Sequence, residues 1–148
     1  MALIDLVSPD VVRVPVSAEN KPDVLKELVD VLYNAGKISN SSDALKALLT
    51  RESQGSTGLE NGIAVPHAKT HVVDSLTLAI GIAPQGVEFD ALDGEPSRLF
   101  FLLLAPPDQS GPHIEALSEI ARLTRSQAFC RTLASANSPE EVVELFQD

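Results

Sequence analysis

Leu99–Ala105 reads LFFLLLA and is the longest apolar run in the 148-residue chain. It is far too short to span a bilayer as a helix. A short run that is apolar at every position is typical of a strand buried on both faces. Such strands lie in the middle of sheets that helices cover on two sides. This segment therefore predicts an internal sheet between two helical layers.

Three further segments have the composition of strands. Leu76–Ala83 (LTLAIGIA) is apolar enough for a second buried strand, and Ile63–Val65 is a short apolar run. Val11–Val16 (VVRVPV) alternates and is rich in β-branched residues, and its proline favours the edge of a sheet. Between the two most apolar strands, Asp93-Gly94 is a hairpin signal in a turn-rich passage. The sequence thus predicts strands in both halves of the chain.

Helical segments lie between and after these strands. Each has apolar residues at helical spacing, and several begin with a capping residue or a proline. The expected helices are Pro22–Asn34, a segment from a cap at Ser41 or Ser42 to about Arg51-Glu52, a segment from Pro112, Ser126–Ala134, and a segment from Pro139 with Ser138 in a capping box. Because helices and strands are interleaved, the sequence predicts a three-layer α/β fold.

The overall composition limits the number of domains and the kinds of partner. No linker, repeat or low-complexity tract divides the chain, so a single domain is expected over residues 1–148. The chain carries 11 basic and 21 acidic residues, a formal net charge of −10. No basic stripe is present to bind nucleic acid, and the charge argues against adhesion to an anionic membrane surface.

Cysteine usage and the N-terminal sequence indicate a compartment. The single cysteine, Cys130, cannot form an internal disulfide, which suits a reducing environment. We expect it to be a small apolar residue packed on a helix. The first residues, MALIDLVSPD, lack the basic and long apolar regions of a signal peptide. A cytoplasmic protein that does not insert into a membrane is therefore expected.

Gly55–Thr70 (GSTGLENGIAVPHAKT) is the segment most indicative of chemistry. Its glycines permit a ligand to approach the backbone closely. The run Ile63–Val65 is stopped by Pro66, with His67 directly after it. A histidine displayed at a strand end is partly neutral at pH 7, so that one ring nitrogen can act as a nucleophile. A histidine beside proline is also commonly a solvated or packed side chain, and spacing alone leaves both roles open.

Two other residues are expected near His67. Arg51 lies at the end of a predicted helix upstream, and His113 lies in the first turn of another, after Pro112. Since α/β folds place their sites where element ends meet at one rim of the sheet, the three side chains form a candidate site. An arginine fork and the free N–H groups of a helix start both favour a phosphoryl group. Taken singly, Arg51 and His113 could each be a solvated surface residue.

Alternative chemistries have weaker support. His67 and His71 are four residues apart, as in a zinc-binding helix, but Ala68 replaces the glutamate of H-E-x-x-H and the segment is expected to be a loop. Ser56 and Thr57 could supply hydroxyl donors, yet their loop lacks the spacing and the lysine of a P-loop. No G-x-S-x-G elbow of a serine hydrolase is present. The residues favour transient phosphorylation of a histidine over ATP-dependent kinase or hydrolase chemistry.

The sequence resembles the EIIA domains of the fructose/mannitol type, including their nitrogen-regulatory branch, of the bacterial phosphoenolpyruvate-dependent phosphotransferase system. The likeness covers nearly the whole chain. It rests on Arg51-Glu52, Ser56–Gly58, Gly62–His67 (GIAVPH), Phe89–Asp93, Phe100–Pro106 and His113 with Ala116–Ala121. The combination of G-I-A-V-P-H with an upstream R-E pair and a downstream histidine is highly specific.

This resemblance implies a role for each site residue. His67 matches the phospho-accepting histidine, which takes phosphate from HPr or an HPr-like carrier and passes it to an EIIB component. His113 matches the second active-site histidine, and Arg51 matches the arginine that supports the phosphorylated state. The resemblance further implies a mixed β-sheet with helices on both faces, and neither a metal nor an organic cofactor. Gly111-Pro112 departs from the usual lead into the second histidine, which bears on where His113 points.

The resemblance leaves more than one function open. The chain is predicted to be a phosphotransferase component of coupled sugar uptake and phosphorylation, with EIIB and the membrane component on other chains. The alternative is a nitrogen-regulatory type of phosphoprotein, whose phosphorylation state controls partner proteins. A third possibility is a degenerate EIIA that only binds partners, but the intact histidines and arginine argue against it.

Overall fold

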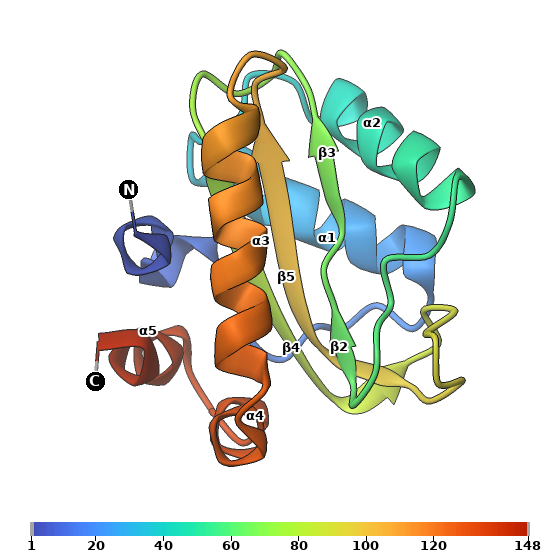
Figure 1. The fold of residues 1–148 in the computed structure, drawn as a ribbon, viewed down its shortest axis with the longest axis vertical. Coiled ribbons are helices and arrows are strands. Elements are labelled where there is room, and N and C mark those ends of the chain that lie inside the picture. Colours follow the sequence, from blue (N-terminus) through green and yellow to red (C-terminus); the bar gives the residue numbers. More distant parts are fainter. Residues whose placement is uncertain (1, 148) are drawn as a thin grey trace.

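A computed structural model describes residues 2–147 of the chain. A five-stranded sheet forms its centre, with helices on both faces (Figure 1). The strands are β1 (Val12–Arg13), β2 (Ile63–Ala64), β3 (His67–Lys69), β4 (Thr77–Val87) and β5 (Ser97–Ala105). The helices are α1 (Lys21–Asn34), α2 (Ser41–Ser53), α3 (Ser110–Thr124), α4 (Gln127–Ala134) and α5 (Pro139–Gln147), preceded by 3-10 turns at Leu3–Leu6 and Pro9–Val11. Within residues 2–147, no helix has the length and apolarity needed to cross a bilayer.

The sheet is mixed, as the family resemblance implied. β4 and β5 pair antiparallel at its centre, joined by the turn-rich passage in which Gly94 adopts a φ of +73°. β1 lies parallel to β4 at one edge, and β2 and β3 both lie parallel to β5 at the other. The expected hairpin between the two most apolar strands is confirmed.

The sheet separates two apolar cores, and the alternation of side chains along β5 divides them. Phe100 and Leu102 pack with α1 and α2 on one face. Leu99, Phe101 and Leu103 pack with α3, α4 and α5 on the other. All five are buried, because a central strand is covered on both faces. Figure 1 shows α3 in front of the sheet and α1 behind it, which confirms the three-layer prediction.

Two strands differ in length from the expectation. The strand expected over Val11–Val16 is reduced to β1, although its position at the sheet edge is confirmed. Pro15 has no N–H to donate to a ladder, so regular pairing ends before it. β4 continues beyond Ala83 to Val87, with an irregularity in its pairing to β5, so the turn-rich passage begins later than expected.

The cap of α2 is also not the one expected. Asn40, rather than Ser41 or Ser42, precedes the helix with extended backbone, and its side chain accepts a hydrogen bond from the Asp43 N–H at 3.0 Å. That bond satisfies one of the N–H groups left without an intrahelical partner at a helix start. Asparagine serves this role as well as serine does, so a run of polar residues does not say which one is the cap. α2 ends at Ser53, which places Arg51 in its last turn as expected.

Candidate functional site

His67 begins a strand, which corrects the expectation that it lies in a loop after one. β2 ends before Pro66, and pairing to β5 resumes at His67, opposite Leu103. Pro66 cannot donate to the ladder, but its carbonyl accepts a hydrogen bond from the Leu103 N–H at 2.9 Å. The backbone therefore stays extended through the proline. In an extended strand His67 and Lys69 point to one face and Ala68 to the other.

One backbone contact determines which nitrogen of the His67 ring carries the proton. Nδ1 lies 2.8 Å from the carbonyl oxygen of Val65. Since a carbonyl oxygen only accepts, Nδ1 is the protonated nitrogen of this pair. In the neutral ring, Nε2 then holds the free lone pair. His67 is half-buried and lines a cavity of about 770 Å³, so the arrangement suits a nucleophile.

His113 lies near the end of the first turn of α3, which begins two residues earlier than expected. The helix starts at Ser110, and the His113 N–H makes a long hydrogen bond to the Gln109 carbonyl, at 3.4 Å. Pro112 is tolerated inside the first turn because the N–H groups there have no intrahelical partner in any case. The free N–H groups of this turn are therefore those of Ser110 and Gly111, fewer than the sequence suggested.

The ring of His113 is buried beside that of His67. Its exposed fraction is 5%, and the two ring centroids lie 5.4 Å apart with an interplanar angle of 77°. Nε2 of His113 is one of two buried side-chain atoms within residues 2–147 that lack a hydrogen-bond partner. Burial lowers the pKa of His113, and electrostatic interaction with the neighbouring His67 and Lys69 lowers it further. The lowered pKa favours a neutral ring at pH 7, and its buried Nε2 has no partner within the chain.

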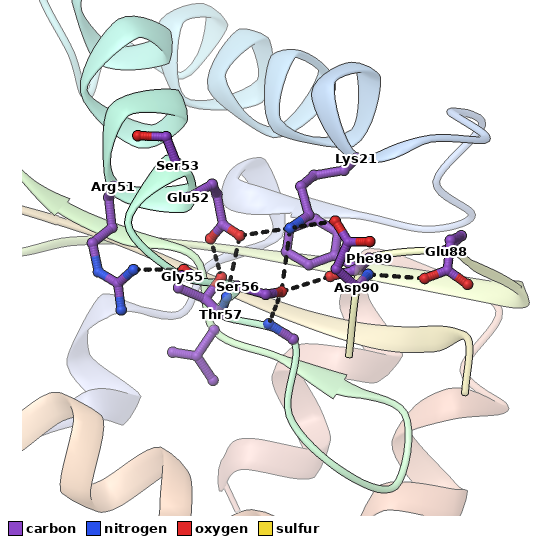
Figure 2. A network of polar contacts seen from close by, with 12 residues as sticks. Lys21, Arg51, Glu52, Ser53, Gly55, Ser56, Thr57, Glu88, Phe89 and Asp90 are labelled. Carbon is purple, nitrogen blue, oxygen red and sulfur yellow. Dashed lines mark hydrogen bonds and ion pairs between the residues drawn. The ribbon is translucent and has the colours of Figure 1, made fainter. Parts of the chain in front are cut away.

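Arg51 reaches the same cavity from α2. Arg51, His67 and His113 all line it, so the structure brings the three predicted site residues together. The Arg51 guanidinium donates a hydrogen bond to the Gly55 carbonyl at 2.7 Å (Figure 2), which holds the side chain across the end of its own helix. This bond uses one of its five donors and leaves the others for a ligand.

The cavity is cationic in a chain that is strongly acidic overall. Lys46 and Lys69 line it together with Arg51, and Asp43 is the acidic residue among the lining side chains. Sequence reasoning missed both lysines. Lys69 had a usable signal, because it follows His67 by two positions and so shares its strand face. Lys46 had no such signal, because no local sequence pattern indicates that α2 packs beside β3.

The hydroxyl groups of Ser56 and Thr57 donate to protein acceptors, although both residues line a smaller cavity together with Arg51 and His67. Ser56 donates to the Phe89 carbonyl at 2.7 Å, and Thr57 donates to the Glu52 carboxylate (Figure 2). The expectation that they would serve a ligand was wrong. Each is used to fasten its loop to neighbouring segments.

The structure offers no grouping for a metal. Across residues 2–147, no three His, Cys, Asp or Glu side chains come together so as to hold an ion. His71 lies exposed in the turn after β3, and the segment from His67 to His71 is not helical, so the spacing of a zinc-binding helix does not apply. Cys130 lies on α4 and is partly buried; burial raises its pKa, which suits the apolar role expected for it.

Comparison with known sequences identifies the family. Residues 5–148 match the family described as phosphoenolpyruvate-dependent sugar phosphotransferase system, EIIA 2. A nitrogen regulatory protein of Klebsiella oxytoca is 34% identical over 151 residues, covering 100% of this chain and 91% of the relative. A fructose-specific EIIA component of Haloferax volcanii is 33% identical over 128 residues, covering 86% and 83%. The fructose-specific EIIABC component of Bacillus subtilis is 34% identical over 145 residues, but this chain spans only 23% of its length.

Solved structures agree with this assignment. The nitrogen regulatory protein IIA-Ntr of Neisseria meningitidis superposes with a TM-score of 0.88 at 30% identity, covering 97% of this chain and 98% of that one. The mannitol IIA of Escherichia coli superposes with a TM-score of 0.81 at 22% identity, covering 95% and 98%, and supports the fold alone. The resemblance noted from the sequence is confirmed: the chain belongs to the EIIA type 2 family of the phosphoenolpyruvate-dependent sugar phosphotransferase system.

Proposed function

We propose that this chain is a phosphohistidine carrier. It accepts a phosphoryl group on Nε2 of His67 from HPr or an HPr-like carrier, and passes it to an EIIB component for coupled sugar uptake and phosphorylation. The observation that carries the proposal is the contact of 2.8 Å between Nδ1 of His67 and the Val65 carbonyl. It leaves the lone pair of Nε2 free at a half-buried ring beside a cationic cavity.

The transfer step needs no general base. The Nε2 lone pair attacks the phosphorus of the donor's phosphohistidine, and a new P–N bond forms as the donor's P–N bond breaks. The electron pair of the broken bond stays on the donor ring nitrogen, and the Nδ1 proton of His67 stays with the Val65 carbonyl. Catalysis is then a matter of positioning and of stabilising charge on the phosphoryl oxygens. Onward transfer to an acceptor runs through the same step in reverse.

The groups around His67 can stabilise negative charge on the phosphoryl oxygens. Arg51 offers a planar fork to phosphoryl oxygens, and Lys69 adds a second positive charge from the strand of His67 itself. Nε2 of His113 has no partner, and in the neutral tautomer that is protonated there it would donate a hydrogen bond to an oxygen of the same group.

The test is phosphorylation with phosphoenolpyruvate, enzyme I and HPr. We expect an acid-labile phosphate on the wild-type chain, located by mass spectrometry, and none on His67→Ala. His71→Ala is the matched control: His71 is a second histidine that lines the cavity, but it lies exposed in the turn after β3, and this variant should still be labelled. Label retained on His67→Ala, or no label on the wild type with any HPr-like donor, would overturn the proposal.

A nitrogen-regulatory role is the second candidate. The relative from Klebsiella oxytoca is a nitrogen regulatory protein and matches as well as the fructose-specific relatives do. The mannitol IIA of Escherichia coli has been solved in complex with phosphorylated mannitol IIB. Transfer from the phosphorylated chain to EIIB proteins of the same genome separates the two roles. Transfer to an EIIB supports sugar uptake, and its failure with every EIIB present supports regulation.

A further inference from the structure

A polar cluster lies behind the loop that joins Arg51 to β2, away from the cavity. Nζ of Lys21, the first residue of α1, lies 3.0 Å from the Glu52 carboxylate and 3.2 Å from that of Asp90. It also lies 3.2 Å from the Ser56 hydroxyl and 4.6 Å from the centre of the Phe89 ring (Figure 2). The side chains of Lys21 and Glu52 are only 15% and 5% exposed. Three segments far apart in the sequence therefore converge on one lysine.

Glu52 holds Thr57 by two contacts. Its carboxylate accepts the Thr57 N–H at 3.1 Å and also accepts the Thr57 hydroxyl. Thr57 is 3% exposed, so its polar groups have no access to water and depend on these partners. The ion pair with Lys21 at 3.0 Å in turn holds the carboxylate in place. Glu52 and Lys21 together thus determine where the Thr57 backbone lies.

From Thr57 the hydrogen bonds continue to the His67 ring. The Thr57 carbonyl accepts the Val65 N–H at 3.0 Å, and the Val65 carbonyl accepts Nδ1 of His67 at 2.8 Å. An unbroken series of contacts thus runs from Lys21 through Glu52, Thr57 and Val65 to the imidazole. It joins the N-terminus of α1 to the group that fixes the histidine tautomer.

We propose that Glu52, held by Lys21, is a positioning residue for His67, acting through Thr57 and Val65 to fix the ring with its proton on Nδ1. It does not contact the phosphoryl group. Without the carboxylate, Thr57 loses both contacts, the Val65 peptide is free to rotate, and the His67 ring is no longer held in one tautomer. The consequence for phosphoryl transfer rests on the function proposed above, whereas the consequence for the tautomer does not.

The experiment measures the ring directly. The ¹⁵N NMR shifts of the imidazole nitrogens, recorded on the unphosphorylated full chain, distinguish a protonated nitrogen from an unprotonated one. Wild type should show a neutral His67 ring with Nδ1 protonated. In Glu52→Ala and Thr57→Val the two tautomers should be mixed, and the rate of phosphoryl acceptance from HPr should fall about 10- to 100-fold, the loss typical of slight misplacement of a reacting group.

Three further variants separate an effect on the position of His67 from an effect on stability. Glu52→Gln keeps an acceptor for the Thr57 N–H and a polar partner for its hydroxyl, so it should restore most of the Nδ1 preference lost in Glu52→Ala. Lys21→Met should loosen the tautomer, whereas Lys26→Met should not. Lys26 is the matched control on the same helix, paired with Asp30 at 2.9 Å on an exposed face.

The outcomes are distinct. A single Nδ1–H tautomer in folded Glu52→Ala and Thr57→Val would overturn the inference, even if both variants melt earlier. Should Glu52→Ala not fold, Thr57→Val decides alone, since it removes only the hydroxyl contact. A wild-type chain that accepts no phosphate overturns the proposed function and leaves the tautomer result to decide this inference.

Discussion

The two walls of the His67 cavity are built differently. On the α2 side Arg51 lines the cavity, and Glu52 and the loop Gly55–Gly58 lie behind it. We call these residues together the α2 wall; hydrogen bonds from its charged and hydroxyl side chains hold it in place. The α3 wall, from Ser110 to Leu117, instead places a buried His113 against the site with its Nε2 unpartnered. The side chains of the α2 wall are held in place by contacts within the protein. The α3 wall contains a buried polar atom that has no partner within the protein.

The unpartnered Nε2 of His113 has an energetic cost. A buried polar group without a partner costs about 1–3 kcal/mol of stability, so folded proteins contain few of them. The α2 wall avoids this cost because Lys21, Thr57 and Ser56 all find partners. The unpartnered nitrogen of His113 is therefore a candidate contact for a ligand, consistent with the role proposed for it at the phosphoryl group.

The largest expected effect comes from removing the contact group of each wall. Arg51→Ala and His113→Ala should each slow phosphoryl acceptance about 10²- to 10³-fold, the usual loss when one stabilising donor is removed from a developing charge. Single-turnover transfer from phosphorylated HPr measures this. Glu115→Gln, an exposed neighbour on α3, is the control. A wild-type rate of phosphoryl acceptance in His113→Ala would show that His113 makes no useful contact with the phosphoryl group.

A methyl group added to the α2 wall should destabilise the protein. An added Cβ at Gly58 would lie 2.8 Å from the Phe89 carbonyl oxygen and 3.0 Å from Cα of Ala91, both backbone atoms that cannot easily move. Gly58→Ala should therefore lower the free energy of unfolding by about 1–3 kcal/mol, as overpacking usually does. Urea unfolding measures it. An unchanged midpoint would mean that the loop is less fixed than its hydrogen bonds indicate.

The same change on the α3 wall should have the opposite sign. At Gly111 an added Cβ would meet no atom within 4 Å, and the residue lies in the first turn of α3. Because alanine favours the helix over glycine, Gly111→Ala should raise the free energy of unfolding by up to about 1 kcal/mol. The same urea titration applies, and a loss of stability there would contradict the contrast between the walls.

The smallest expected effect is a pH dependence from the α3 wall. The pKa of His113 in the folded chain is below its ordinary value of 6.5. Between that value and the lowered one, the unfolded chain binds a proton that the folded chain does not, so falling pH reduces stability in this window. The free energy of unfolding, measured against pH, should therefore differ between wild type and His113→Asn in this window. It should depend less on pH in the variant. Parallel curves would indicate that the folded ring takes up its proton as readily as a solvated histidine.

Much of the fold was predictable because it depends on local patterns. The run LFFLLLA correctly indicated a central strand, and its alternation assigned residues to two cores without reference to the rest of the chain. The start of α5 after Ser138 followed from capping chemistry, and the helix expected over Ser126–Ala134 is present with Ser126 as its cap. The start of α3 did not, because a proline is compatible with more than one position in a first turn, and the sequence does not distinguish Ser110 from Pro112.

The residues of the site could be predicted from the sequence, but the contacts that hold them in place could not. Motif resemblance singled out Arg51, His67 and His113, which the structure places around one cavity. The contact between Lys21 and Glu52 joins residues 31 positions apart, and neither carries a local signal of the other. That His67 begins a strand likewise depends on its pairing with β5, a contact across the sheet. Long-range contacts of this kind hold the backbone around His67, and no local pattern contains them.

The strand that carries His67 lies at the open margin of the sheet, since β3 pairs with β5 alone. Such margins invite strands of neighbouring molecules to join and aggregate. Here the strand has only three residues, follows Pro66 and ends in the exposed charge of Lys69, all of which discourage that addition. The features that keep this strand short thus also discourage self-association through the edge that carries His67.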